Sequence, residues 1–157
     1  MAGSGGSVRP RFPQNGRVGV LALEVDALVE RPCGPERPGE RIHNAAELVR
    51  ALVRTPHHRV TLEPEPDDRF GHPGTHLRLR AGPLAECVAS DGPFWLWDTQ
   101  VGPMESPGVG ARMDLWVVDI GTRPVMLAAV STPDTPRSAL EELDAVVKSV
   151  EFVPGPG

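Results

Sequence analysis

The stretch that decides the fold reads Arg112-Met-Asp-Leu-Trp-Val-Val-Asp119, then Ile120-Gly-Thr-Arg123, then Pro124-Val-Met-Leu-Ala-Ala-Val130. Apolar and β-branched residues dominate both flanks, as is typical of paired strands. Gly121 supplies the positive φ that a tight turn requires, and Asp119 or Thr122 can bond its own backbone there. The sequence therefore predicts a β-hairpin with its turn at residues 120–123.

A helix is predicted directly after this hairpin, over residues 136–149. Pro136 suits the first turn, where its missing N–H is harmless, and Thr135 is expected to cap the helix. One apolar stripe runs along the predicted helix, and such a stripe has to lie on a sheet; its members are Ala139, Leu140, Leu143, Val146, Val147 and Val150. A short closing strand is predicted at residues 150–153.

The residues before the hairpin add further strands and one more helix. A Val- and Leu-rich run predicts a strand over 18–29, and Asn44-Ala-Ala-Glu47 has the form of a capping box for a helix over 44–54. Alternating patterns at 58–62 and 75–80 predict two strands, and an aromatic run predicts another at 94–98. We therefore expect an α+β fold, with an antiparallel sheet of five to seven strands and two helices packed against it.

Length and composition bound the domain organisation and the class of partner. The 157 residues allow one core, with a disordered lead-in at 1–16, a single α+β domain at 17–153 and a C-terminal tail at 154–157. A net charge of −5 argues against nucleic-acid binding. No run approaches the roughly 20 apolar residues of a membrane-spanning helix, so no transmembrane segment is expected.

The histidines do not form a recognisable metal or catalytic motif. His72 and His76 have the spacing of a zinc-binding pair, but Pro73-Gly74 between them forbids the helix that such a pair needs. We expect the five histidines to be solvated loop residues and predict no metal, no cofactor and no catalytic residue. Asp119-Ile-Gly-Thr122 is similar to the phosphate loop of actin-like kinases, but a hairpin turn accounts for it better.

Tryptophan and cysteine supply the remaining candidate site residues. Trp95, Trp97 and Trp116 form either core packing or a surface for a ligand or partner, since exposed tryptophan is typical of binding hot spots. Cys33 and Cys87 lie in Pro/Gly-rich loops, where a disulfide, two unrelated buried thiols or a metal site are the alternatives.

The order of these motifs resembles an uncharacterised actinobacterial domain family over residues 20–153. The residues that carry the resemblance are the Leu-Trp-x-x-Asp run at 115–119, the Glu-Leu-x-x-x-Val-x-Ser-Val-x-Phe ending at 142–152, and the Gly-x-x-Gly turn at 71–74. The family pattern also has a cysteine after the first strand and another before an aromatic strand, which implies a disulfide between Cys33 and Cys87. Family members are extracytoplasmic modules, often on lipoproteins, without assigned catalytic residues. A more distant likeness is to the PsbP-type α/β sandwich.

These observations favour a non-catalytic extracytoplasmic or cell-envelope module that binds a partner protein or a small ligand. The location depends on an export signal upstream of Met1; otherwise the chain is expected to be cytoplasmic. The alternatives are a cytoplasmic scaffold or regulatory domain, and a hydrolase that uses loop histidines.

Overall fold

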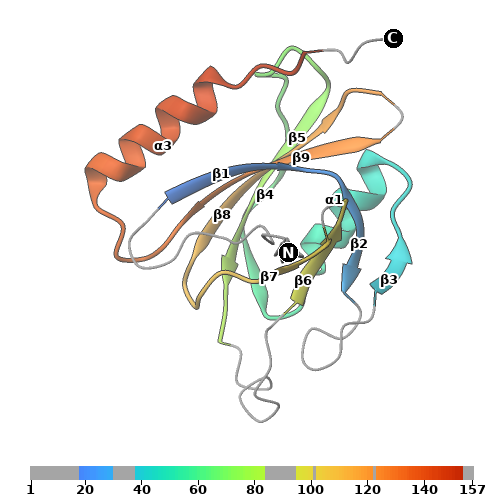
Figure 1. Cartoon of the computed structure of the whole chain (residues 1–157), viewed down its shortest axis with the longest axis horizontal. Helices are drawn as coiled ribbons and strands as arrows, with labels where there is room; N and C mark the ends of the chain where they lie inside the picture. The colour runs from blue at the N-terminus through green and yellow to red at the C-terminus, as the bar shows by residue number, and fades with distance from the viewer. Residues whose placement is uncertain (1–17, 30–37, 84–94, 101, 122, 154–157) are drawn as a thin grey trace, which may run out of the picture.

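The computed structural model describes residues 18–29, 38–83, 95–100, 102–121 and 123–153 (Figure 1). The predicted lead-in at 1–16, the tail at 154–157 and both cysteines, with the predicted disulfide, lie outside these residues.

Two antiparallel sheets form the framework. The first has five strands in the order β1-β9-β8-β5-β4, and the second has four in the order β3-β2-β6-β7. The first sheet comprises β1 (Val18–Leu23), β4 (His58–Pro66), β5 (Gly74–Ala81), β8 (Arg112–Asp119) and β9 (Pro124–Ser131). The second comprises β2 (Val25–Val29), β3 (Pro38–Arg41), β6 (Trp95–Thr99) and β7 (Gly102–Glu105). The two helices are α1 (Ala45–Val53) and α3 (Arg137–Ser149).

The predicted α+β class, the antiparallel pairing and both helices are confirmed. β8 and β9 form the predicted hairpin, with Asp119 opposite Pro124 and Gly121 at a φ of 155°. One difference is that the strand predicted over 18–29 divides at Glu24 between the two sheets. There the backbone of Glu24 bonds Gln100 instead of a neighbouring strand. The Glu24 N–H donates to Gln100 Oε1 at 2.9 Å, and the Glu24 carbonyl accepts a hydrogen bond from the Gln100 N–H at 3.2 Å.

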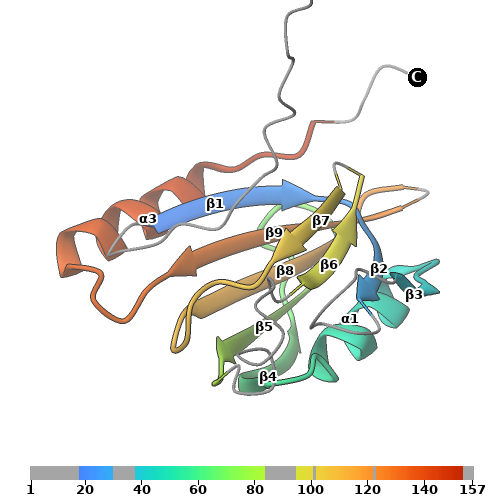
Figure 2. The ribbon, with the colours of Figure 1, turned by 60° about the horizontal axis from the view of Figure 1, so that its bottom comes forward.

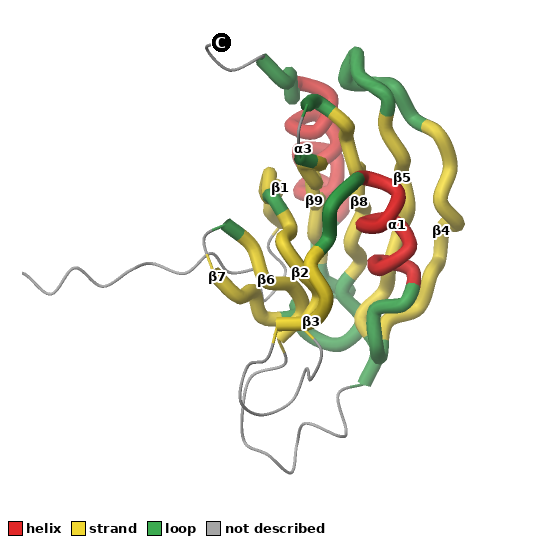
Figure 3. Tube along the Cα trace, turned by 90° about the vertical axis from the view of Figure 1, so that its right-hand side faces the viewer, coloured by secondary structure: helices red, strands yellow, loops and turns green. Residues whose placement is uncertain are grey.

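The core lies between the two sheets, and α1 closes one end of it. Leu48 and Leu52 of α1 are buried in the same cluster as Leu77, Leu115 and Trp97. The predicted cap of this helix is confirmed, because the Asn44 side chain accepts a hydrogen bond from the Glu47 N–H at 2.9 Å. Figure 3 shows α1 beside β2 and in front of β8, on the inner side of the five-stranded sheet.

Helix α3 covers part of the opposite, outer face of the five-stranded sheet (Figure 2). Its Val147 is buried in a second, smaller cluster with Trp116, Val118, Leu127 and Ala129. Because side chains alternate along a strand, β8 and β9 supply both clusters, one from each face. The outer face is only partly apolar, and a cavity lies where α3 meets the polar part of this face.

Two predictions about the ends of α3 are wrong. Thr135 does not cap the helix, since its hydroxyl accepts the Thr132 N–H at 3.0 Å and Pro136 occupies the cap position without a side-chain bond. Residues 150–153 form no strand. Instead, Val150 and Phe152 pack against the second cluster, and Phe152 makes an edge-to-face contact with Phe70 at 5.4 Å between ring centroids.

Candidate functional site

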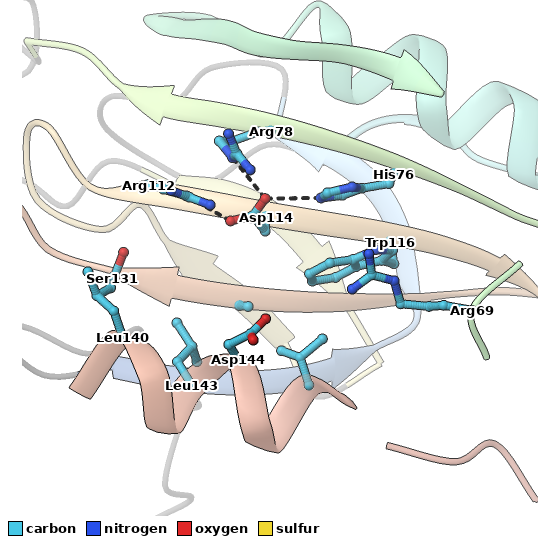
Figure 4. Close-up of a pocket in the computed structure, with 12 residues that line it drawn as sticks. Arg69, His76, Arg78, Arg112, Asp114, Trp116, Ser131, Leu140, Leu143 and Asp144 are labelled. Atoms are coloured by element: carbon cyan, nitrogen blue, oxygen red, sulfur yellow. Dashed lines mark hydrogen bonds and ion pairs between the residues drawn. The ribbon is translucent and has the colours of Figure 1, made fainter. Parts of the chain in front are cut away.

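A cavity of about 240 Å³ lies between α3 and the outer face of the five-stranded sheet. Its sheet side carries charged and aromatic residues of β5 and β8, and its helix side carries mainly apolar residues of α3 (Figure 4). A cavity of this size has room for several water molecules or for a small ligand.

Asp114 is the centre of the charged side and is only 9% exposed. Its Oδ1 lies 2.8 Å from Arg78 Nε and 3.0 Å from His76 Nε2, and its Oδ2 lies 2.8 Å from Arg112 Nε. Three donors therefore surround one carboxylate, as Figure 4 shows. Removing a carboxylate from water costs free energy, and these charge-assisted hydrogen bonds offset that cost.

Strand register brings these residues together. His76 lies opposite Trp116 and Arg78 opposite Asp114 in the antiparallel β5–β8 pair, and Arg112 precedes Asp114 by two residues on the same face. Odd-numbered neighbours such as Leu77 and Leu115 point into the core. The apolar inner face thus fixes the register, and the register places the charged residues side by side.

The electrostatics of the cluster favour the ionised form of Asp114. Burial raises the pKa of this carboxyl group, but hydrogen bonds from His76, Arg78 and Arg112 outweigh burial and lower it to about 2. Asp114 is therefore a fixed negative charge near neutral pH, and two guanidinium groups are held close together around it.

Those guanidinium groups keep unused donors. Among the described residues, the side chains of Arg78 and Arg112 each donate a hydrogen bond only from Nε and only to Asp114. An arginine carries five N–H donors, so the terminal amino groups remain for a ligand. Asp114 neutralises one of the two positive charges, and the sheet side of the cavity keeps a net positive charge at Arg78 and Arg112.

Trp116 and His76 form an ordered wall beside this cluster. Their rings stack at 4.4 Å between centroids with 10° between planes, and the Trp116 indole N–H donates to Asp67 Oδ2 at 3.3 Å. Arg69 lies over the Trp116 ring at 5.0 Å. Burial raises the pKa of Asp67, but the Arg69 backbone N–H, the Arg69 charge and the Trp116 N–H together lower it.

Helix α3 supplies the opposite wall. Leu140, Leu143 and Val147 line the cavity with apolar surface, and Asp144 points from the helix toward the sheet (Figure 4). Asp144 lies 2.8 Å from Lys148 in an exposed pair one turn apart. The cavity thus has three arginines opposite the helix, Arg69, Arg78 and Arg112, and its helix side has one carboxylate, Asp144, among apolar side chains.

The structure places two of the predicted tryptophans, Trp97 and Trp116, in different surroundings. Trp116 lines the cavity, whereas Trp97 is 0% exposed in the core between the sheets and is not available at a surface. The reason is strand alternation, since β6 points Trp97 toward the other sheet. Trp95 pairs with Glu105 in the second sheet, and its side chain is outside the described set.

His76 corrects the expectation that the histidines are solvated loop residues. It lies on β5, is 8% exposed and contacts Asp114. His58 is also half-buried, with Nε2 at 3.1 Å from Ser106 Oγ. In the part of the chain that the structure describes, no three His, Cys, Asp or Glu residues are placed to hold a metal ion.

Sequence reasoning missed Arg78, Arg112 and Asp114. A signal was present, because Asp114 is a charged residue inside an otherwise apolar strand and Arg78 alternates with Leu77 and Leu79. Charges at period two mark one face of a strand, but only the register shows which charges become neighbours.

A larger cavity of about 780 Å³ lies near the start of α1, between residues of β4, β5 and β8. Prolines and small residues form much of its lining, including Pro64, Pro66 and Pro73. We take the smaller cavity as the candidate site because it contains the buried Asp114, which is bonded to His76, Arg78 and Arg112.

Comparisons with protein-family models, with curated proteins and with solved structures found no match to this chain. Within the described residues, neither helix is long and apolar enough to cross a membrane.

Proposed function

We propose that this protein is a non-catalytic binding module that holds a small carboxylate-bearing ligand in the cavity between α3 and the five-stranded sheet. The observation that carries the proposal is the pair Arg78 and Arg112, positioned by the buried Asp114 through Nε. Arginine recognises carboxylates through paired N–H donors, and the terminal donors of both arginines bond no other described residue.

The apolar helix wall supports a ligand with a short hydrocarbon part. Leu140, Leu143 and Val147 face the arginines across the cavity, so a carboxylate head can contact the guanidinium groups while a short chain contacts α3. The ordered Trp116 and His76 wall also supports binding, because a ligand entering a preorganised site loses less free energy to ordering side chains.

The hydrolase alternative receives less support from the same geometry. His76 Nε2 is bonded to Asp114, and Nδ1 faces Asp67 and Glu65, each at 3.9 Å. Both ring nitrogens thus face carboxylates, and within the described residues no hydrogen bond links His76 to Ser131, the serine that lines the cavity. A general base needs a nitrogen within reach of the nucleophile.

The extracytoplasmic location and the Cys33–Cys87 disulfide belong to this proposal. The location rests on the family resemblance, and the disulfide rests on that resemblance and on the position of both cysteines in Pro/Gly-rich loops. Mass spectrometry after alkylation without reduction, on protein from an oxidising compartment, tests the disulfide. Two alkylated cysteines in unfolded protein would contradict it.

The binding proposal is tested by titrating the protein with acetate, propionate and butyrate while recording ¹H–¹⁵N NMR spectra. We expect saturable shifts in the arginine Nε–H signals and in the indole signal of Trp116. Arg112→Gln should weaken binding at least tenfold, because it removes one of the two guanidinium groups that are bonded to Asp114. Arg59→Gln is the matched control, since Arg59 is an exposed arginine of β4 that does not line the cavity. Unsaturable shifts, or equal binding by both variants, would refute the proposal.

A further inference from the structure

We infer that the ligand of this cavity carries an ammonium group as well as a carboxylate, as a small amino acid does. This inference rests on the proposed function and adds the class of ligand. Its basis is the charge distribution across the cavity, with Arg78 and Arg112 on the sheet side and Asp144 on the helix side (Figure 4).

Asp144 differs in its position from the other acidic residues of α3. Glu141 and Glu142 are exposed and do not line the cavity, whereas Asp144 lines it between Leu143 and Val147. Helical spacing explains the difference, because residues 140, 143, 144 and 147 share one face of the helix. The face that covers the sheet thus presents a carboxylate to the two arginines.

A ligand with a carboxylate alone would share the cavity with the Asp144 carboxylate. The repulsion between like charges would weaken the binding of such a ligand. A ligand with an ammonium group converts the repulsion into attraction. The cavity of about 240 Å³ leaves room for a ligand of this size.

The existing partner of Asp144 does not prevent this contact. Lys148 lies 2.8 Å from Asp144, but the two side chains are 70% and 61% exposed. Exposed ion pairs one helical turn apart contribute little, and both partners are screened by water. A carboxylate has two oxygens and about four acceptor sites, so Asp144 can accept a ligand ammonium while it keeps Lys148.

The experiment is isothermal titration calorimetry of the full chain with matched ligand pairs. Glycine, β-alanine and γ-aminobutyrate are compared with acetate, propionate and butyrate, which have the same carbon chains without the ammonium group. At least one amino acid should bind about two- to fivefold more tightly than its partner acid, the range expected for one partly screened ion pair. The best member of the series reports the spacing between the two charges.

Asp144→Asn should remove this preference and leave the acids bound at least as tightly as before. Glu141→Gln is the matched control on the same helix, because Glu141 is in an exposed pair with Arg137 and does not line the cavity. Equal affinity for acids and amino acids in the unchanged protein would overturn the inference while the proposed function stands. A preference that persists in Asp144→Asn would also overturn it. Failure of every acid and every amino acid to bind would overturn both proposals.

Discussion

Replacing Asp114 with Asn tests whether this buried carboxylate organises the site, and the effect should depend on pH in a defined way. At pH 7 the variant keeps an oxygen acceptor of similar shape but loses the negative charge between Arg78, Arg112 and His76. We expect a clear loss in the free energy of unfolding at pH 7, and a progressively smaller loss as the pH falls toward 2.

The magnitude follows from the pKa of Asp114, which is lowered from its ordinary value of 3.8 to about 2. At about 1.4 kcal/mol for each tenfold change in proton affinity, this difference corresponds to about 2 kcal/mol. The folded pKa lies below the unfolded one, so the unfolded chain binds the proton more readily. This stabilisation is complete above pH 3.8 and is lost as the pH falls through about 2.

Urea denaturation of both proteins at several values between pH 2 and pH 7 measures the effect. Other carboxylates also titrate in this range, so the informative quantity is the difference between the two proteins at each pH. Asp68→Asn is the control, since Asp68 is exposed and lies outside the Asp114 cluster. A difference that stays constant from pH 7 to pH 2 would refute the reasoning, because the ionised cluster would then contribute nothing specific.

Three further predictions concern the framework around the site. Leu115→Ala should lower the free energy of unfolding by about 2–5 kcal/mol in urea denaturation, because Leu115 is fully buried on the inner face of β8. An added Cβ at Gly74 would lie 2.6 Å from the Asp67 carbonyl oxygen, so Gly74→Ala should lower the free energy of unfolding by about 1–3 kcal/mol. A Cβ at Gly108 would meet nothing within 4 Å, so the control Gly108→Ala should lower it by less than about 0.5 kcal/mol. Burial lowers the pKa of His58 below 6.5, so the protein should lose stability as the pH falls below 6.5, and His58→Gln should reduce that loss in thermal melts across pH 5–8.

The hairpin at residues 112–131 and the two amphipathic helices were predictable because their signals are local. Alternation of apolar residues defines the strands, a glycine allows the turn, and Asn44 caps its own helix. The physical reason is that a strand or helix with one apolar face must bury that face. The spacing of apolar residues in the sequence shows which face is buried. The α+β class follows from these elements.

The division into two sheets and the composition of the site were decided by tertiary structure. Glu24 carries no sequence signal for a strand break, and its bonds to Gln100 arise from chain segments 76 residues apart. The same holds for the site, where Arg78 and Asp114 come from strands 36 residues apart and meet only through the β5–β8 register. The position of a charged residue in a strand shows which face of the sheet the residue occupies, but not which residue lies beside it. The neighbour depends on the strand register, which is set by how the apolar inner faces pack. The sequence determined the elements and their buried sides, and packing of the two sheets and α3 determined which charges became neighbours.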